Sequence, residues 1–419
     1  MIKDNSIKGE NSMQVSLKLL LPLLASIMAL SPLAIDMYLP AMPILAEHLA
    51  TDIPMVQNSL SIYLLGYALG LILFGPMADK HSRRKLVLFG ISGFLVTSLL
   101  LPVVANIEQF LSLRFIQAFI SSAATVVVPG AIREYYQKNT AKGLSYVSMI
   151  MMLAPMIAPS IGSVLLVAHS WQLIFYVLAS YSVILLLLVM KYLPDAVRDA
   201  VRDNTGQIKL GKNSETSFLR RYQIVFSNKE ARLDILSSMI TSLAFFSYIT
   251  AISFIYITVY LVSEFNFSIL FGITVFALMT SHFINTRLVT RKGSRKMLLY
   301  GLTVAVISSS ALLLVNIFSM PLVFTVLSIM PLMGSISMVS VNSDALVLTK
   351  FPEQSGTATA VIGTLRFGIG SLAGPILAYF YDGSAVPFAG LMFSSVLLVL
   401  LCQLMIYMNG QQKNVRNIA

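Results

Sequence analysis

The sequence predicts an all-α polytopic membrane protein, and three observations support this prediction. Hydrophobic residues make up 57% of the chain and charged residues only 11%, whereas soluble proteins carry about 25% charged residues. Apolar runs of about 20 residues, the helix length that crosses the hydrocarbon of a bilayer, recur along the whole chain. The basic residues fall on one side of the resulting topology. The basic residues that give the chain its formal net charge of +11 therefore mark loops that flank the membrane, and no nucleic-acid partner is expected.

We place twelve membrane helices along the chain. The backbone of a spanning segment has to satisfy its own hydrogen bonds in lipid, and the sequence lacks the alternating pattern of a membrane β-barrel, so the apolar runs are helices. The expected spans are 17–39, 56–77, 86–105, 108–130, 144–167, 172–193, 233–261, 268–287, 297–316, 321–346, 357–380 and 386–408.

The basic residues test this topology. All but two of the 29 Lys and Arg lie at loops or ends on one side of the twelve-helix arrangement, and the opposite loops contain none. Basic residues mark the cytoplasmic side, so we expect both termini in the cytoplasm and the chain in a bacterial inner membrane. The first run is too long for the apolar part of a secretory signal, and we expect it to be a retained helix.

A polar stretch divides the chain into two sets of six helices. We expect an N-terminal bundle over 1–193, a cytoplasmic linker over 194–231 and a C-terminal bundle over 232–419. Weak internal similarity supports two pseudo-repeats, because Arg-Lys-Leu-Val-Leu-Phe-Gly at 84–90 aligns with Arg-Lys-Met-Leu-Leu-Tyr-Gly at 295–301. The alternative is that any basic turn before an apolar helix resembles any other.

Asp36 is the one acidic residue well inside an apolar run. A carboxylate inside a bilayer costs about 2.5–3.5 kcal/mol on insertion scales. Burial favours the neutral form of a carboxylic acid and a nearby cation favours the charged form, so alternating surroundings can load and release a proton. We interpret Asp36 as the proton carrier; the alternative is a carboxylate in the outer headgroup zone. Asp234 and Asp344, nearer to predicted cytoplasmic ends, are interpreted as solvated or structural.

The two remaining basic residues, Arg114 and Arg366, lie inside apolar runs, where a buried arginine must find an acceptor. We expect Arg114 to tune Asp36 or to join a polar network at the substrate; the alternative is a static clamp on backbone carbonyls. Arg366 lies near the membrane midplane, and we expect no carboxylate of the second half at its depth. It would reach Asp36 or meet an anionic or polar substrate, unless it is a structural hydrogen-bond hub.

The substrate cavity is expected to be mostly apolar, with few polar contacts. Aromatic and amide side chains in the apolar runs can supply these contacts, although most aromatic residues in such helices face lipid or pack. The expected cavity residues are Tyr38, Tyr67, Gln117, Tyr248, Asn342 and Arg366.

The turn after the second helix reads Gly-Pro-Met-Ala-Asp-Lys-His-Ser-Arg-Arg-Lys over 75–85. Gly75 allows close helix approach, Asp79 favours a nearby helix N-terminus, and Arg83 and Arg84 can bridge carboxylates across a closed cytoplasmic face. This turn resembles the Gly-x-x-x-Asp-x-x-Gly-Arg-[Arg/Lys] signature of the major facilitator superfamily. Ser82 stands where that family usually has glycine, which implies a turn that is either tighter or differently hydrogen-bonded.

Other segments resemble the Bcr/CflA drug-resistance transporters of the twelve-helix drug:proton antiporter group. The matching segments are Asp-Met-Tyr-Leu-Pro-Ala-Met-Pro at 36–43, Leu-Arg-Phe-Ile-Gln-Ala at 113–118, Arg-Glu-Tyr-Tyr at 133–136, the proline-rich 153–162 and Pro-Glu-Gln-Ser-Gly-Thr-Ala at 352–358. The resemblance runs essentially end to end. It implies the major facilitator fold of two six-helix bundles, alternating access and proton-driven efflux.

The same resemblance assigns conformational gating to Glu134 and to the fifth helix, where it resembles the antiporter motif of exporters. Pro155, Pro159 and Gly162 break helix hydrogen bonds and thin one face of that helix. The alternative is an ordinary kink.

No motif of catalysis occurs in the sequence. It has no phosphate-binding loop, and its four histidines have no metal-ligand spacing, so we expect no enzyme, no metal and no cofactor other than a proton gradient. We expect a monomeric exporter of small, largely apolar compounds whose partners are its substrate, protons and the bilayer. Alternatives are a dedicated exporter of an endogenous metabolite such as a siderophore or amino-acid derivative, an importer, and a non-transporting receptor on the same fold.

Overall fold

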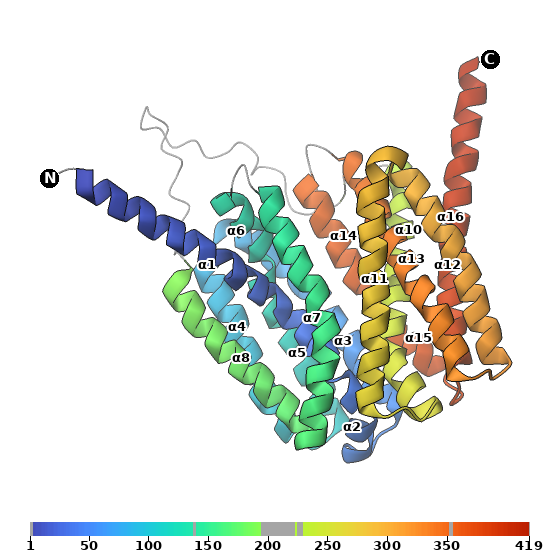
Figure 1. Cartoon of the computed structure of the whole chain (residues 1–419), viewed down its shortest axis with the longest axis horizontal. Helices are drawn as coiled ribbons and strands as arrows, with labels where there is room; N and C mark the ends of the chain where they lie inside the picture. The colour runs from blue at the N-terminus through green and yellow to red at the C-terminus, as the bar shows by residue number, and fades with distance from the viewer. Residues whose placement is uncertain (1–2, 137–139, 194–222, 224–228, 352–354, 419) are drawn as a thin grey trace. The chain divides into compact units, whose positions relative to one another are not determined.

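A computed structural model describes residues 3–136, 140–193, 223, 229–351 and 355–418 (Figure 1). These residues are almost entirely helical, and no strand occurs among them. Twelve segments of the described chain are helical, long and apolar enough to cross a membrane. Their bounds lie close to the expected spans, so the prediction of an all-α protein with twelve membrane helices is confirmed.

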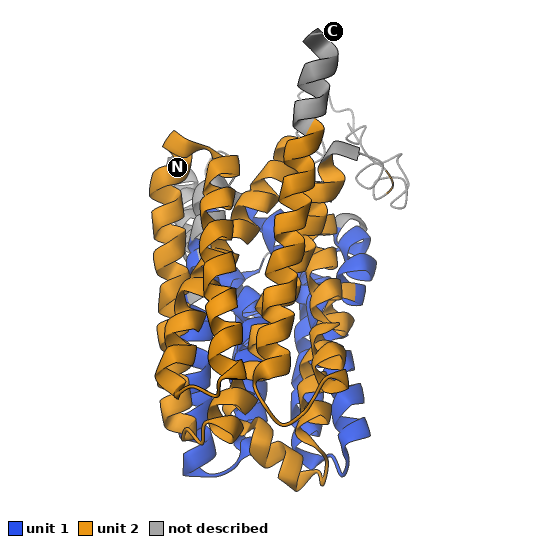
Figure 2. Cartoon of the chain, turned by 90° about the vertical axis from the view of Figure 1, so that its right-hand side faces the viewer, with its two compact units in different colours: residues 1–39, 69–215 blue, residues 40–68, 216–419 orange. Residues whose placement is uncertain are grey.

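The chain divides into two compact units, residues 1–39 with 69–215 and residues 40–68 with 216–419 (Figure 2). The division expected at 194–231 falls almost entirely outside the described residues, and the three expected domains stay a prediction. The second helical span, α3 (Ile53–Lys80), contributes residues to both units. Each unit is described below by itself.

The helices of unit 1 supply the first group of spans. Besides the last part of α3, they are α1 (Lys3–Asp36), α4 (Arg83–Leu100), α5 (Ile107–Thr125), α6 (Val127–Tyr136), α7 (Thr140–Ala168) and α8 (Trp171–Tyr192), with a 3₁₀ turn at Leu101–Val103. α4 packs against α5 and α8, and α1 packs against α7. Gly90 lets α4 approach α5 closely, because a Cβ there would collide with the backbone of Ala124.

The helices of unit 2 supply the second group. They are a 3₁₀ turn at Leu39–Ala41, α2 (Met42–His48), the first part of α3, α10 (Lys229–Ser253), α11 (Glu264–Lys292), α12 (Ser294–Ile317), α13 (Leu322–Thr349), α14 (Ser355–Gly370), α15 (Ala373–Tyr379) and α16 (Val386–Ile418). α12 packs against α13, and α10 packs against α13, α14 and α16.

Two spans of unit 2 are irregular for reasons that lie in the backbone. α10 continues into a π-helix over Phe254–Val259, and the N–H of Tyr260 donates to the carbonyl of Ile255 at 3.0 Å, five residues back. The eleventh span breaks between α14 and α15, where Pro375 has no N–H to donate. Gly374, beside it, donates its N–H to the hydroxyl of Ser61 at 2.8 Å. The break therefore ties α15 to α3.

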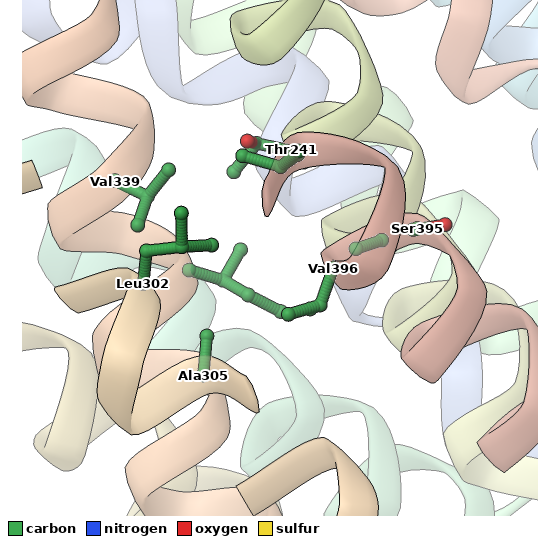
Figure 3. Close-up of a pocket in the computed structure, with 9 residues that line it drawn as sticks. Thr241, Leu302, Ala305, Val339, Ser395 and Val396 are labelled. Carbon is green, nitrogen blue, oxygen red and sulfur yellow. The ribbon is translucent and has the colours of Figure 1, made fainter. Parts of the chain in front are cut away.

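Unit 2 also contains a small cavity between α10, α12, α13 and α16 (Figure 3). Its volume is about 10 Å³, about the space of a single water molecule. Nine side chains line it, and all but two are apolar: Thr241, Ala244, Leu302, Ala305, Ile336, Val339, Ser395, Val396 and Val399. Because ligand pockets measure about 300–1,000 Å³, this cavity is a packing void and no cargo site.

Candidate transport site

Asp36 is the last residue of α1 and is buried. The helix ends here because Pro40 and Pro43 follow within the next two turns and have no N–H for a helical hydrogen bond. Among the described residues, no ion pair and no hydrogen bond of the Asp36 side chain occurs. A lone buried carboxylate is costly, so the group has to be neutralised by a proton or by a cation brought close to it.

Arg114 lies on α5 and is fully buried. Its Nη2 donates to the carbonyl of Ala34 at 3.0 Å, and its guanidinium carbon lies 4.5 Å from the ring centre of Tyr38. Ala34 belongs to the last turn of α1, where carbonyls lack helical donors of their own. Arg114 therefore clamps the end of α1 through a backbone carbonyl and an aromatic face, on either side of Asp36 in sequence.

A chain of neutral hydrogen-bonding groups extends from Arg114 to α4. Its Nη1 donates to the Oε1 of Gln117 at 2.8 Å, and the Nε2 of Gln117 donates to the hydroxyl of Ser98 on α4 at 2.9 Å. Gln117 and Ser98 are fully buried. The hydrogen bond to Ala34 is the clamp on a backbone carbonyl that was the alternative interpretation of Arg114. A role of Arg114 in tuning Asp36 or in contacting substrate stays a prediction.

Gly162 on α7 faces the backbone of the residue that follows Asp36. A Cβ on Gly162 would collide with the carbonyl oxygen of Met37, so only glycine permits this approach of α7 to the end of α1. Pro155 and Pro159 lie inside the same helix, Pro159 being buried and Pro155 partly buried. The fifth span is thus packed on the segment that carries Asp36.

The basic turn between α3 and α4 has two described arginine contacts. Arg84 donates from Nη2 to the carbonyl of Met190, in the last turn of α8, at 2.5 Å. The guanidinium of Arg83 lies beside Gly130 of α6, 3.4 Å from the position of a Cβ. Ser82 caps α4, because its hydroxyl accepts from the N–H of Lys85 at 3.4 Å, which is the different hydrogen bonding that its replacement of glycine implied.

Three other gating candidates give less information. Gly75 lies inside α3 and has open space where a Cβ would be. Asp79 and Glu134 belong to α3 and α6, but their side chains lie outside the described part of the structure. The gating roles of all these residues stay predictions.

Arg366 on α14 has a carboxylate partner within unit 2, contrary to the expectation that the second half offers none at its depth. Its Nη2 pairs with the Oδ2 of Asp344 on α13 and donates to the hydroxyl of Ser340 at 3.1 Å. The Oδ1 of Asp344 accepts from the hydroxyl of Ser238 on α10 at 2.6 Å. The expectation failed because an arginine side chain spans about one helical turn and so reaches a carboxylate nearer the helix end.

The remaining cavity candidates are buried within their own unit. Tyr67 packs edge-on against Phe367, with ring centres 4.6 Å apart, and Tyr248 stacks on Phe271. Asn342 donates from Nδ2 to the Oδ1 of Asn285 at 2.7 Å, which joins α13 to α11. These contacts are those of packed side chains, and contact of the three residues with cargo stays a prediction.

Asp234, interpreted from the sequence as solvated or structural, lies in a charged cluster whose members were not predicted. Asp234 on α10 is fully buried. Its carboxylate accepts hydrogen bonds from both Nη atoms of Arg295 at 2.9 and 3.1 Å and from the Nζ of Lys350 at 2.8 Å. Arg295 also donates to the Oε1 of Gln403 at 2.6 Å. The cluster ties α10, α12 and α16 to the end of α13. Its signal was available, because the charge pattern places all three charged residues on the same side of the membrane.

Comparison with known proteins identifies the family. The Major Facilitator Superfamily model matches residues 24–407. The chain belongs to the major facilitator superfamily. It is 27% identical over 359 residues to a bicyclomycin resistance protein homolog of Haemophilus influenzae, covering 85% of this chain and 88% of that protein. It is 30% identical over 384 residues to the uncharacterized MFS-type transporter YdgK of Bacillus subtilis, covering 88% and 91%.

A solved structure shows the same fold. A bacterial homolog of the human lysosomal transporter Spinster, in an inward-facing and unoccupied conformation, matches with a TM-score of 0.71 at 14% identity, over 93% of this chain and 96% of that one. The resemblance to the major facilitator superfamily and its fold is confirmed. The chain is a multi-pass membrane protein of a transporter family, and that family and fold indicate a transporter rather than an enzyme.

Proposed function

We propose that this protein is a proton-coupled exporter of small, largely apolar compounds, working by alternating access. The observation that supports the proposal most is Asp36, a buried carboxyl group without an ion pair among the described residues. When such a group moves between dry and wet surroundings, it exchanges a proton rather than remain a lone charge in an apolar medium. The bicyclomycin resistance homolog supports efflux of antibiotic-like cargo.

The surroundings of Asp36 support the same proposal. Nη1 and Nη2 of Arg114 donate to Gln117 and Ala34, which are neutral acceptors. The guanidinium is therefore held at the last turn of α1, which ends at Asp36, and no ion pair between the two groups occurs among the described residues. Gly162 of α7 lies against the carbonyl of Met37, and we propose that a movement of α7 relative to α1 changes which groups face Asp36.

The proposal also covers the oligomeric state, the location and the energy source of the protein. The protein works as a monomer in a bacterial inner membrane with both termini in the cytoplasm, and the proton gradient replaces any cofactor or metal. Its basic loops support this orientation.

Flux in proteoliposomes tests the proposal. Under an imposed pH gradient, the wild type should accumulate cationic or neutral test compounds against their own gradient, and Asp36→Asn should abolish this accumulation. Asp52→Asn is the matched control, because the exposed Asp52 only caps α3 through the N–H of Met55 and Asn caps equally well. If Asp36→Asn still accumulates compounds like the wild type, the proton assignment is wrong.

A dedicated exporter of a carboxylated metabolite is the second candidate. Arg366 is the observation that favours it, because its guanidinium lies inside a membrane span with a side chain that is 33% exposed. A carboxylated compound in the same flux assay separates the two candidates.

A further inference from the structure

The pairing of Arg366 with Asp344 is incomplete. The carboxylate engages the guanidinium through one nitrogen, Nη2, and one oxygen, Oδ2, whereas a fork-to-fork pair would use two parallel hydrogen bonds. The Nε–H of Arg366 is buried and has no acceptor in the described structure. A buried donor without an acceptor costs about 1–3 kcal/mol, so an additional oxygen acceptor at this guanidinium would be stabilising.

The pair is also accessible and has space beside it. The side chains of Arg366 and Asp344 are 33% and 22% exposed. Gly363 lies one turn before Arg366 on the same face of α14, and no atom of a neighbour lies within 4 Å of where its Cβ would be. The neighbouring Phe367 contacts the rings of Tyr67 and Phe246. The ring of Phe246 also lies against Gly370, one turn after Arg366 on the same face of α14. The face of α14 that carries Arg366 thus has open space at Gly363 and an aromatic ring at Gly370.

The Asp234 cluster is an ion pair of the same unit that we call closed, because both oxygens of the carboxylate and both Nη atoms of its arginine are paired. Asp234 is fully buried and uses both oxygens on both Nη atoms of Arg295, with Lys350 as a second cation. Asp344 is partly exposed, has one arginine nitrogen and gives its other oxygen to the hydroxyl of Ser238. The first arrangement suits a permanent link between helices, and the second suits exchange.

We propose that Arg366 binds the carboxylate of an aromatic carboxylated cargo, and that Asp344 is the resident counter-ion which this carboxylate displaces. A ligand carboxylate can take two guanidinium donors where Asp344 takes one, and Asp344 then retains its hydrogen bond from Ser238. The aromatic part of the ligand packs near Phe367. This inference rests on the second candidate of the proposed function, the export of a carboxylated metabolite, because it names the cargo class and the group that selects it.

Binding to the purified full-length protein tests the inference without any proton gradient. The probes are 2-naphthoate and its neutral amide, 2-naphthamide, and the measured quantity is the ratio of their dissociation constants by calorimetry. Asp344→Asn removes the competing charge, so naphthoate affinity should rise about tenfold while naphthamide affinity stays the same. Arg366→Gln should abolish the preference for the carboxylate, and Arg366→Lys should restore part of it.

Two further variants make the outcome decisive. Asp234→Asn removes a carboxylate of the closed cluster and should leave the naphthoate-to-naphthamide ratio unchanged. Asp36→Asn should also leave it unchanged, so loss of proton coupling and loss of carboxylate recognition are read separately. The inference is overturned if Asp344→Asn weakens both probes alike, or if the wild type and Asp344→Asn show no preference for the carboxylate.

Discussion

In unit 1, the arginine inside a membrane span is held by neutral groups, whereas in unit 2 it is held by a carboxylate. Arg114 donates to a backbone carbonyl and to the Gln117 side chain. Arg366 pairs with Asp344. Both units therefore carry an acid and a base in the membrane interior, but they use them differently.

The different surroundings of Arg114 and Arg366 suggest two different tasks for an arginine and an acid in the membrane interior. Where both Nη atoms of the arginine donate to neutral acceptors, as at Arg114, no ion pair with the acid Asp36 of the same unit occurs among the described residues. Where the arginine pairs with the acid itself, as Arg366 does with Asp344, opening the pair requires another group that takes the place of the carboxylate. Proton exchange is thus expected in unit 1 and charge recognition in unit 2.

The largest effect on stability is expected at Arg114. Arg114→Ala leaves the carbonyl of Ala34 and the amide of Gln117 buried without their donor, which should lower the free energy of unfolding by about 3 kcal/mol. Reversible unfolding in mixed micelles measures it. Arg366→Ala is the matched control and should cost less, because water reaches its partly exposed partner. Equal losses for both variants would show that the two arginines do the same structural work.

The second largest effect is expected for Gly162→Ala, because the added methyl group meets the carbonyl of Met37 and forces α7 away from α1. We expect a loss of about 2–3 kcal/mol together with slower proton-linked flux. Gly75→Ala is the control, since open space surrounds that position and alanine improves helix propensity. An unchanged melting temperature for Gly162→Ala would refute the close contact on which Asp36 depends.

A smaller loss, about 1–2 kcal/mol, is expected for Asp234→Asn. The carboxylate is fully buried, but the side chains of its cations Arg295 and Lys350 are 35% and 25% exposed, so water compensates part of the lost attraction. Asp344→Asn, compared in the same unfolding assay, should cost less. The contrast between a closed and an exchangeable pair fails if Asp344→Asn is the more damaging change.

The smallest effect is expected at the far end of the neutral chain. Ser98→Ala removes the acceptor of the Gln117 amide and should cost about 1 kcal/mol. Ser112→Ala, whose exposed hydroxyl bonds only the carbonyl of Glu108 in its own helix, should be close to neutral. Thermal unfolding of the two variants side by side measures the difference, and identical behaviour would remove Ser98 from the network.

The sequence was sufficient for the architecture because lipid imposes a length and a composition on every span. It was also sufficient to single out Asp36, Arg114 and Arg366, since charge in an apolar run is rare. It was insufficient for their partners. Arg114 meets Ala34 through a backbone atom, which no side-chain pattern reveals, and Arg366 meets Asp344 through the reach of a long side chain, which counting residues from helix ends underestimates.

Helix irregularities were likewise only partly visible. Pro375 signals the break before α15, but nothing in the amino-acid sequence of Phe254–Val259 distinguishes a π-helix from an α-helix.

The π-helix over Phe254–Val259 has a consequence for comparing this chain with its relatives. Such a widened turn corresponds to a single inserted residue, and every position beyond it is shifted by one relative to a helix without the insertion. An alignment that places the gap elsewhere would pair Tyr248, upstream of the turn, or Tyr260, downstream of it, with the wrong residue of a relative. For a relative whose seventh span is a regular α-helix, the single gap therefore belongs at 254–259.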